Sequence, residues 1–165
     1  MTKPAFILLA GSLILVSCKK PAAPSDNDAA SKAVAELFDT YARATKEKNF
    51  EVLAGTLAED GLFLGTDPDE FWNKQNLMDL FKTTSLDATT SFDITMDKRE
   101  IRISQDGMMA IVVEQSNIPV LSQEISIRGI GHARMVEGQW KIDFYSWSLI
   151  PQNEDLARLN NAMEK

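Results

Sequence analysis

The sequence predicts an α+β fold, because helical patterns fill the first half of the chain and strand patterns fill the second half. Between residues 31 and 84, apolar residues recur every three or four positions, which is the spacing of one helix face. From residue 92 to residue 150, apolar and polar residues mostly alternate, and turn signals separate the alternating runs. This order favours N-terminal helices that pack on one face of an antiparallel sheet.

Residues 1–17 have the features of a secretory signal peptide. An apolar run over residues 5–16 would form a helix about 18 Å long, shorter than the roughly 30 Å hydrocarbon core of a bilayer. A membrane-spanning helix is therefore not expected. The run ends in LVSC, residues 15–18, which resembles the lipobox of bacterial lipoproteins. That resemblance implies cleavage before Cys18 and lipidation of its thiol, whereas the alternative is an ordinary signal peptide that contains a cysteine.

Cys18 is the only cysteine among 165 residues, so the fold has no intrachain disulfide and depends on its apolar core. Residues 18–30 are predicted to be the lipidated cysteine and a disordered tether, because residues 19–30 hold two prolines and no large apolar side chain. Lys19 stands where lipoproteins retained at the inner membrane often have Asp. By resemblance, the protein is expected in the bacterial cell envelope, with the outer membrane favoured, attached through the lipid on Cys18.

The net charge of −7 gives the chain no electrostatic reason to bind nucleic acid or anionic lipid headgroups. One histidine and one cysteine are too few for a His/Cys metal cluster, and the cysteine is assigned to lipidation. The sequence also has no phosphate-cradling glycine-rich loop and no GxSxG motif. We therefore expect no nucleic-acid partner, no metal and no cofactor.

Two helices are predicted at the start of the folded domain, which we expect to span residues 31–150. The first begins at Ser31 and has the apolar stripe Val34, Phe38 and Tyr41. Asn49 is a suitable N-cap for a shorter second helix, whose apolar face we extend to Leu57.

A short buried strand, residues 62–64, is expected before a third helix. Asp67 has the residue type of an N-cap, Pro68 suits the first helical position, and Glu70 stands where a capping box requires it. The later residues Leu77, Leu80 and Phe81 continue on one side of this predicted helix.

Two hairpins are predicted in the second half. The alternating apolar residues change from even to odd positions between Met96 and Ile101, which indicates a β-bulge or a break in the strand. Asp106-Gly107 is typical of a type I′ turn, and Glu137-Gly138 separates the strand patterns of residues 123–136 and 139–149.

A two-residue loop at Glu137-Gly138 fixes a register for the second hairpin. It pairs Gly131 with Phe144 and Gly129 with Ser146, on the face that suits packing under helices. The two glycines leave space there, either for a strand bend or for a ligand. Ser146 is then either a hydrogen-bonding group of a pocket or a hydroxyl satisfied near its rim.

The opposite face of that hairpin pairs His132 with Asp143 and also carries Tyr145 and Trp147. The carboxylate would orient the imidazole as a base, or the two form a cross-strand salt link. Exposed aromatic residues indicate a partner surface, through which a homodimer would form. The alternative is that residues 151–165, a tail or short helix, cover these aromatics through Leu156, Leu159 and Met163.

Two stretches carry a family resemblance. LAEDGLFLGTDPDEFWNK (residues 57–74) and WKIDFYSWSLIP (residues 140–151) resemble the SnoaL-like, nuclear transport factor 2-like (NTF2-like) superfamily, over roughly residues 31–150. The resemblance implies a cone, in which a curved mixed sheet wraps around helices and encloses an apolar pocket, and it implies frequent dimerisation through the sheet. Its members include isomerases, cyclases, dehydratases, hydrolases and non-catalytic modules. In the isomerases a carboxylate base follows the first strand, where this chain has about Gly65.

We expect a lipid-anchored domain that binds a small apolar or amphipathic ligand without established catalysis. Its expected lining is aromatic, with one serine, although the same residues would also suit an ordinary filled core: Phe38, Tyr41, Phe63, Trp72, Phe81, Trp140, Phe144 and Ser146. One alternative is a lyase, isomerase or hydrolase that uses Asp67 or the His132–Asp143 pair, with Tyr41 at the family's oxyanion-donor position. The other is a protein-interaction module that dimerises through Tyr145 and Trp147.

Overall fold

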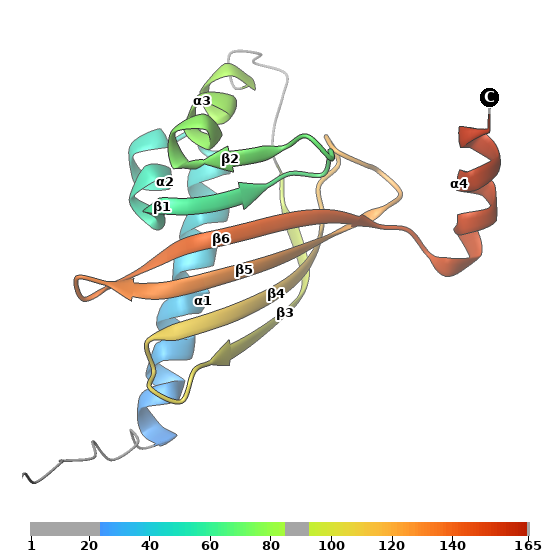
Figure 1. Ribbon diagram of the computed structural model, residues 1–165. Helices are drawn as coiled ribbons and strands as arrows, with labels where there is room; N and C mark the ends of the chain where they lie inside the picture. Colours follow the sequence, from blue (N-terminus) through green and yellow to red (C-terminus); the bar gives the residue numbers. More distant parts are fainter. Residues whose placement is uncertain (1–23, 85–92, 165) are drawn as a thin grey trace, which may run out of the picture.

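The computed structural model describes residues 24–84 and 93–164, so the predicted signal peptide and Cys18 lie outside the described residues. Three helices cover one face of a six-stranded mixed sheet, which confirms the predicted α+β class (Figure 1). The elements in chain order are α1 (Pro24–Lys46), α2 (Phe50–Thr56), β1 (Leu57–Leu64), β2 (Phe71–Asn73), α3 (Lys74–Thr84), β3 (Thr95–Ile103), β4 (Met109–Asn117), β5 (Ser126–Val136), β6 (Gln139–Ile150), the 3-10 turn η1 (Asn153–Asp155) and α4 (Leu156–Met163).

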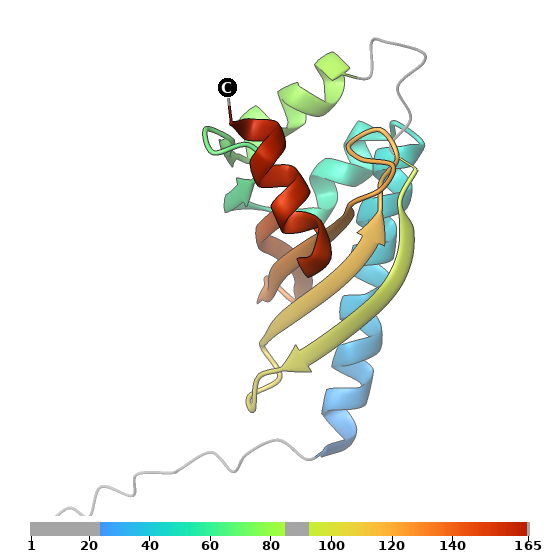
Figure 2. The same cartoon turned by 90° about the vertical axis from the view of Figure 1, so that its right-hand side faces the viewer.

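The strand order is β2-β1-β6-β5-β4-β3, in which β1 runs parallel to β6 and every other neighbouring pair is antiparallel. The long helix α1 crosses the covered face of the sheet, and α2 and α3 lie at the end formed by β1 and β2 (Figure 1). Figure 2 shows α1 running along one side of β3 and β4, and Figure 1 shows α4 standing apart from the sheet. Within the described ranges, no helix is long and apolar enough to cross a membrane.

The first helix starts earlier than predicted. It begins at Pro24, so the assignment of residues 18–30 to a disordered tether is wrong for residues 24–30. Pro suits the first turn of a helix, and Ala29 and Ala30 have the highest helix propensity, which together extend α1 towards the N-terminus. The predicted stripe is confirmed, because Val34, Phe38 and Tyr41 are all buried.

The second helix has the predicted cap, since Oδ1 of Asn49 accepts a hydrogen bond from the Val52 N–H at 3.2 Å. Leu57, however, does not belong to this helix. It has extended backbone angles, begins β1 and pairs with Ile142 of β6. Gly55 and Thr56 have low helix propensity, so the helix ends there and the neighbouring strand captures Leu57.

The predicted start of the third helix at Asp67 is wrong. The capping-type hydrogen bonds do form, because Oε2 of Glu70 accepts from the Asp67 N–H and Oδ1 of Asp67 accepts from the Asp69 N–H, both at 3.0 Å. They stabilise a turn, since the following residues 71–73 pair with the free edge of β1. The helix begins instead at Lys74, where Oδ1 of Asn73 accepts the Asn76 N–H at 2.8 Å.

Both predicted hairpins are present. The expected bulge lies in β3 between Met96 and Lys98. At the first hairpin, Gly107 has a φ of 71°, but among the described non-glycine residues only Lys48 and Glu137 have positive φ, so the type I′ assignment at Asp106 is wrong. The second turn has φ values of 50° at Glu137 and 81° at Gly138, as a type I′ turn requires.

A second bulge, at Asp143, decides which side chains of β6 face the helices. The predicted register holds from the turn to Ala133, which pairs with Ile142, but His132 then pairs with Phe144. One extra residue in β6 reverses the facing of every residue beyond it. Tyr145 and Trp147 therefore face the helices, whereas Phe144 and Ser146 lie on the open face of the sheet. The predicted facing of all four side chains is wrong.

The space beside the two glycines of β5 is filled by aromatic rings. A Cβ at Gly131 would lie 2.5 Å from the Phe38 ring, and one at Gly129 would lie 2.8 Å from the Tyr145 ring. Phe38 and Tyr145 pack edge to face with their ring centroids 5.3 Å apart. The glycines thus allow close approach of core aromatics.

We predict that Gly131→Ala lowers the free energy of unfolding by about 1–3 kcal/mol, because the added methyl group overpacks the buried Phe38 ring. Urea unfolding followed by circular dichroism measures the change. Gly55→Ala in α2 is the matched control, since nothing lies within 4 Å of a Cβ at that position. It should leave stability unchanged or raise it by up to about 1 kcal/mol. Equal stability of the two variants would contradict this packing.

Candidate functional site

A cavity of about 200 Å³ lies between the covered face of the sheet and helices α1 and α3. Its walls are aromatic and aliphatic, with three threonines and a single carboxylate among the described lining residues. They are Tyr41, Thr45, Gly65, Thr66, Glu70, Trp72, Leu77, Leu80, Phe81, Thr84, Ile94, Ile118, Leu121 and Trp147. The side chains come from elements far apart in the sequence, so only the folded sheet assembles this cavity.

Tyr41 is the most unusual residue of the cavity. Its side chain is 3% exposed, and its buried hydroxyl has no hydrogen-bond partner among the described residues. The ring stacks on Trp147 at 6.3 Å and packs edge to face with Phe81 at 6.4 Å. Burial, helped by the nearby Glu114 carboxylate, raises the pKa of Tyr41 far above its usual value. The hydroxyl therefore stays protonated and is an unsatisfied donor within the described structure.

A buried ion pair lies beside this hydroxyl. Oε1 of Glu114 accepts from Nε of Arg99 at 2.6 Å, and the Tyr145 hydroxyl donates to the other carboxylate oxygen. Arg99 also pairs with Asp39 of α1 at 2.8 Å. Burial, with the charge of Glu114, raises the pKa of Tyr145 well above its usual value. Sequence reasoning missed this cluster, although Glu114 lies on the same alternate positions of β4 as Val112 and Ser116, whose side chains face inward.

Glu70 supplies the only charge on the cavity wall within the described part of the chain. A Cβ at Gly65 would overlap both the Glu70 carboxylate and the Trp72 ring, so these groups lie directly against the Gly65 backbone. The sequence assigned Glu70 to helix capping alone. Its carboxylate in fact accepts the Asp67 N–H and also lines the cavity.

The fold brings only some of the residues that were predicted to line a pocket into the cavity wall. Tyr41, Trp72 and Phe81 line the cavity, joined by Trp147, which was predicted on a partner surface. The others lie elsewhere, in the filled core, at its edge or on the open face of the sheet: Phe38 and Phe63 in the core, Trp140 packed against it, and Phe144 and Ser146 on the open face.

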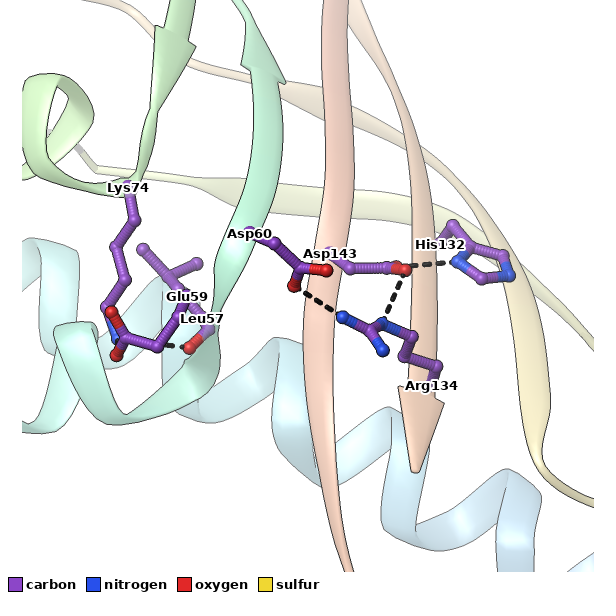
Figure 3. Close-up of polar contacts among 7 residues, drawn as sticks. All are labelled: Leu57, Glu59, Asp60, Lys74, His132, Arg134 and Asp143. Atoms are coloured by element: carbon purple, nitrogen blue, oxygen red, sulfur yellow. Dashed lines mark hydrogen bonds and ion pairs between the residues drawn. The ribbon is translucent and has the colours of Figure 1, made fainter. Parts of the chain in front are cut away.

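The candidate catalytic residues other than Tyr41 lie outside the cavity lining. Asp67 is exposed in the turn before β2. Nδ1 of His132 lies 2.6 Å from Oδ1 of Asp143, although the bulge shifts their backbone pairing (Figure 3). Asp143 also binds Nε of Arg134 at 3.0 Å, and Arg134 pairs with Asp60 of β1. Asp143 therefore has the partners of a cross-strand ion network.

A second groove of about 450 Å³ lies between α2 and α3. It is larger than the cavity but carries paired charges, because Nζ of Lys74 contacts Glu59 at 2.5 Å and the Leu57 carbonyl at 3.2 Å (Figure 3). In the described ranges, no group of three or more His, Cys, Asp or Glu side chains is arranged to hold a metal. The inner cavity, with its unpaired hydroxyl, is the better candidate for a binding site.

Comparison with known protein families identifies the family to which this chain belongs. The SnoaL-like domain family matches residues 34–152, and the protein belongs to this family. No curated protein sequence matches it significantly.

Solved structures share the fold at low sequence identity. An NTF2-like protein of unknown function from Pseudomonas putida KT2440 is 14% identical, with a TM-score of 0.63 over 77% of this chain and 91% of that one. An NTF2-like protein from Cytophaga hutchinsonii is 16% identical, with a TM-score of 0.60 over 73% and 98%. A putative scytalone dehydratase from Novosphingobium aromaticivorans is 14% identical, with a TM-score of 0.60 over 77% and 88%. These similarities establish the NTF2-like fold.

Proposed function

We propose that this protein is a lipid-anchored SnoaL-like domain that binds one small apolar or amphipathic molecule in the cavity of α1, α3 and the sheet. The unpaired buried hydroxyl of Tyr41 carries the proposal. A buried donor without a partner costs about 1–3 kcal/mol, and a ligand oxygen that accepts a hydrogen bond from it removes this cost. The surrounding aromatic rings supply apolar contact area for the rest of the molecule.

The three tryptophans provide the test. Trp72 and Trp147 line the cavity, whereas Trp140 lies outside its lining. Chains that retain only Trp147 or only Trp140, with the other two replaced by Phe, are titrated with small-molecule extract of the host. We expect saturable fluorescence change from Trp147 and none from Trp140. Equal responses, or no response from Trp147, would contradict binding in this cavity.

Enzymatic activity is a second candidate, favoured by one observation. The cavity combines a carboxylate, Glu70, with a hydroxyl donor, Tyr41, and this pair suits general acid–base chemistry of a lyase or isomerase. One similar structure is named as a putative scytalone dehydratase, which is a lyase by name. In this reading Glu70 takes the role of base, in place of Asp67 or His132. Loss of turnover in Glu70→Gln at saturating ligand concentration would distinguish an enzyme from a binding protein.

Dimerisation is the remaining proposal, on a surface different from the predicted one. Tyr145 and Trp147 face the helices, but the open face of the sheet carries large apolar side chains that are 44–65% exposed. This apolar patch consists of Leu62, Phe71, Met109, Ile111 and Ile130. A patch of this kind on a sheet is typical of a protein interface, and a second copy would present the same surface.

We predict that Ile130→Lys shifts the protein from dimer to monomer, because it places a charge among the exposed apolar side chains of this face. Sedimentation equilibrium measures the association state. Val52→Lys is the matched control, since Val52 is also exposed but lies on α2. Two variants with the same association state as the unmodified chain would exclude this face as the dimer interface.

A further inference from the structure

The charge of the cavity wall is unbalanced. None of the described lining residues is Lys, Arg or His, and Glu70 is the single carboxylic acid among them. The nearby Glu114 carboxylate accepts a hydrogen bond from Tyr145, and its negative charge is paired with Arg99. Glu70 therefore has no cationic partner on the cavity wall, and a bound molecule experiences one uncompensated negative charge.

The geometry around Gly65 places that charge beside an aromatic ring. The Glu70 carboxylate and the Trp72 indole both occupy positions that a Cβ at residue 65 would overlap, so only glycine lets the two groups share this wall. Glu70 and Trp72 are half-buried, and Trp147, Tyr41 and Phe81 complete an aromatic lining. A carboxylate next to several aromatic rings is the environment that binds organic cations through charge and cation–π attraction.

The cavity lining also includes a residue with an unsatisfied hydrogen-bond donor. The Tyr41 hydroxyl is fully buried, stays protonated and lacks an acceptor among the described residues. It therefore favours a ligand that carries a hydroxyl or a carbonyl oxygen.

From this geometry we infer that the cavity selects a small amphipathic monocation, an amine or quaternary ammonium compound whose positive end lies against Glu70 and Trp72 and whose oxygen accepts from Tyr41. The inference rests on the proposed function and specifies the class of its ligand. An anionic ligand of the same shape is disfavoured, because Glu70 repels it and no described lining residue offers a positive charge.

A series of three probes of nearly the same shape tests the charge preference. Choline is cationic, 3,3-dimethylbutan-1-ol is its neutral carbon analogue, and 3,3-dimethylbutanoate is anionic. Each is titrated into the mature protein, and binding is measured by Trp fluorescence at low salt. Choline should bind about tenfold more tightly than the neutral alcohol, and the anion most weakly.

Glu70→Gln assigns the preference to one side chain. This variant retains an acceptor for the Asp67 N–H, so the turn should fold as before. We expect choline affinity to fall about tenfold and affinity for the neutral alcohol to stay within about twofold. Glu51 is an exposed residue of α2 that lies outside this cavity. Glu51→Gln removes the same charge and should change neither the affinity for choline nor that for the neutral alcohol.

Three results would overturn the inference: equal affinity for choline and the neutral alcohol, equal effects of Glu70→Gln and Glu51→Gln, or no binding of any probe. None of them decides the proposed function, because the response of Trp147 to host extract tests binding independently of charge. A response to the extract with no preference for choline would retain the ligand-binding function and reject the cationic ligand.

Discussion

Glu114→Ala should lower the free energy of unfolding by about 3–5 kcal/mol, because it leaves Arg99 and the Tyr145 hydroxyl without their buried acceptor. Glu114 is 5% exposed, and its two oxygens are used by these two donors. The guanidinium retains Asp39 and the Ala35 carbonyl, but neither replaces a buried carboxylate. Urea denaturation at neutral pH, followed by circular dichroism, measures the loss.

The double variant Arg99→Met with Glu114→Leu is the control for this prediction. Replacing both members of a buried ion pair by apolar residues is often close to neutral, whereas removal of one member is not. The double variant should therefore be more stable than Glu114→Ala. If Glu114→Ala costs less than about 1 kcal/mol, Glu114 is not the buried centre of this cluster.

Cys18→Ala should abolish membrane attachment and incorporation of labelled fatty acid. The proposed anchor consists of acyl chains alone, and each buried CH₂ group contributes about 0.8 kcal/mol to membrane binding. The acidic chain offers no electrostatic attraction to replace it. Metabolic labelling and membrane fractionation measure both effects.

Ser17→Ala is the matched control, because it changes the neighbouring residue but keeps a small side chain at the cleavage site. It should remain labelled and attached. If the Cys18→Ala variant stays in the membrane fraction, or if neither chain is labelled, the lipoprotein proposal is wrong.

Local signals in the sequence predicted those parts of the fold that depend on neighbouring residues. The stripe of α1 follows from helical spacing, the Asn49 cap from its residue type, and the tight turn at Glu137-Gly138 from its glycine. The resemblance to SnoaL-like proteins supplied the arrangement of these elements around one sheet. Tyr41 and Phe81 were predicted to line the cavity for the same reason, since both lie on inward helix faces.

Non-local pairing decided the features that the sequence did not reveal. The edge of β1 captures residues 71–73 as a strand and delays the third helix to Lys74, although the capping hydrogen bonds at Asp67 form. The bulge at Asp143 places Tyr145 and Trp147 on the inner face, where alternation alone predicted Phe144 and Ser146. A bulge has no residue signature at this position, so alternation alone assigned the wrong face to each side chain.

The most direct test of the ligand-binding proposal is native mass spectrometry of residues 24–165, which include all of the described structure, purified from the native host. The account predicts one retained small molecule per chain, released on denaturation. Leu121→Trp, at the rim of the cavity, should reduce its occupancy, whereas Val120→Trp, at a neighbouring exposed position outside the lining, should not. A spectrum with no bound mass, or equal occupancy in both variants, would contradict a ligand site in this cavity.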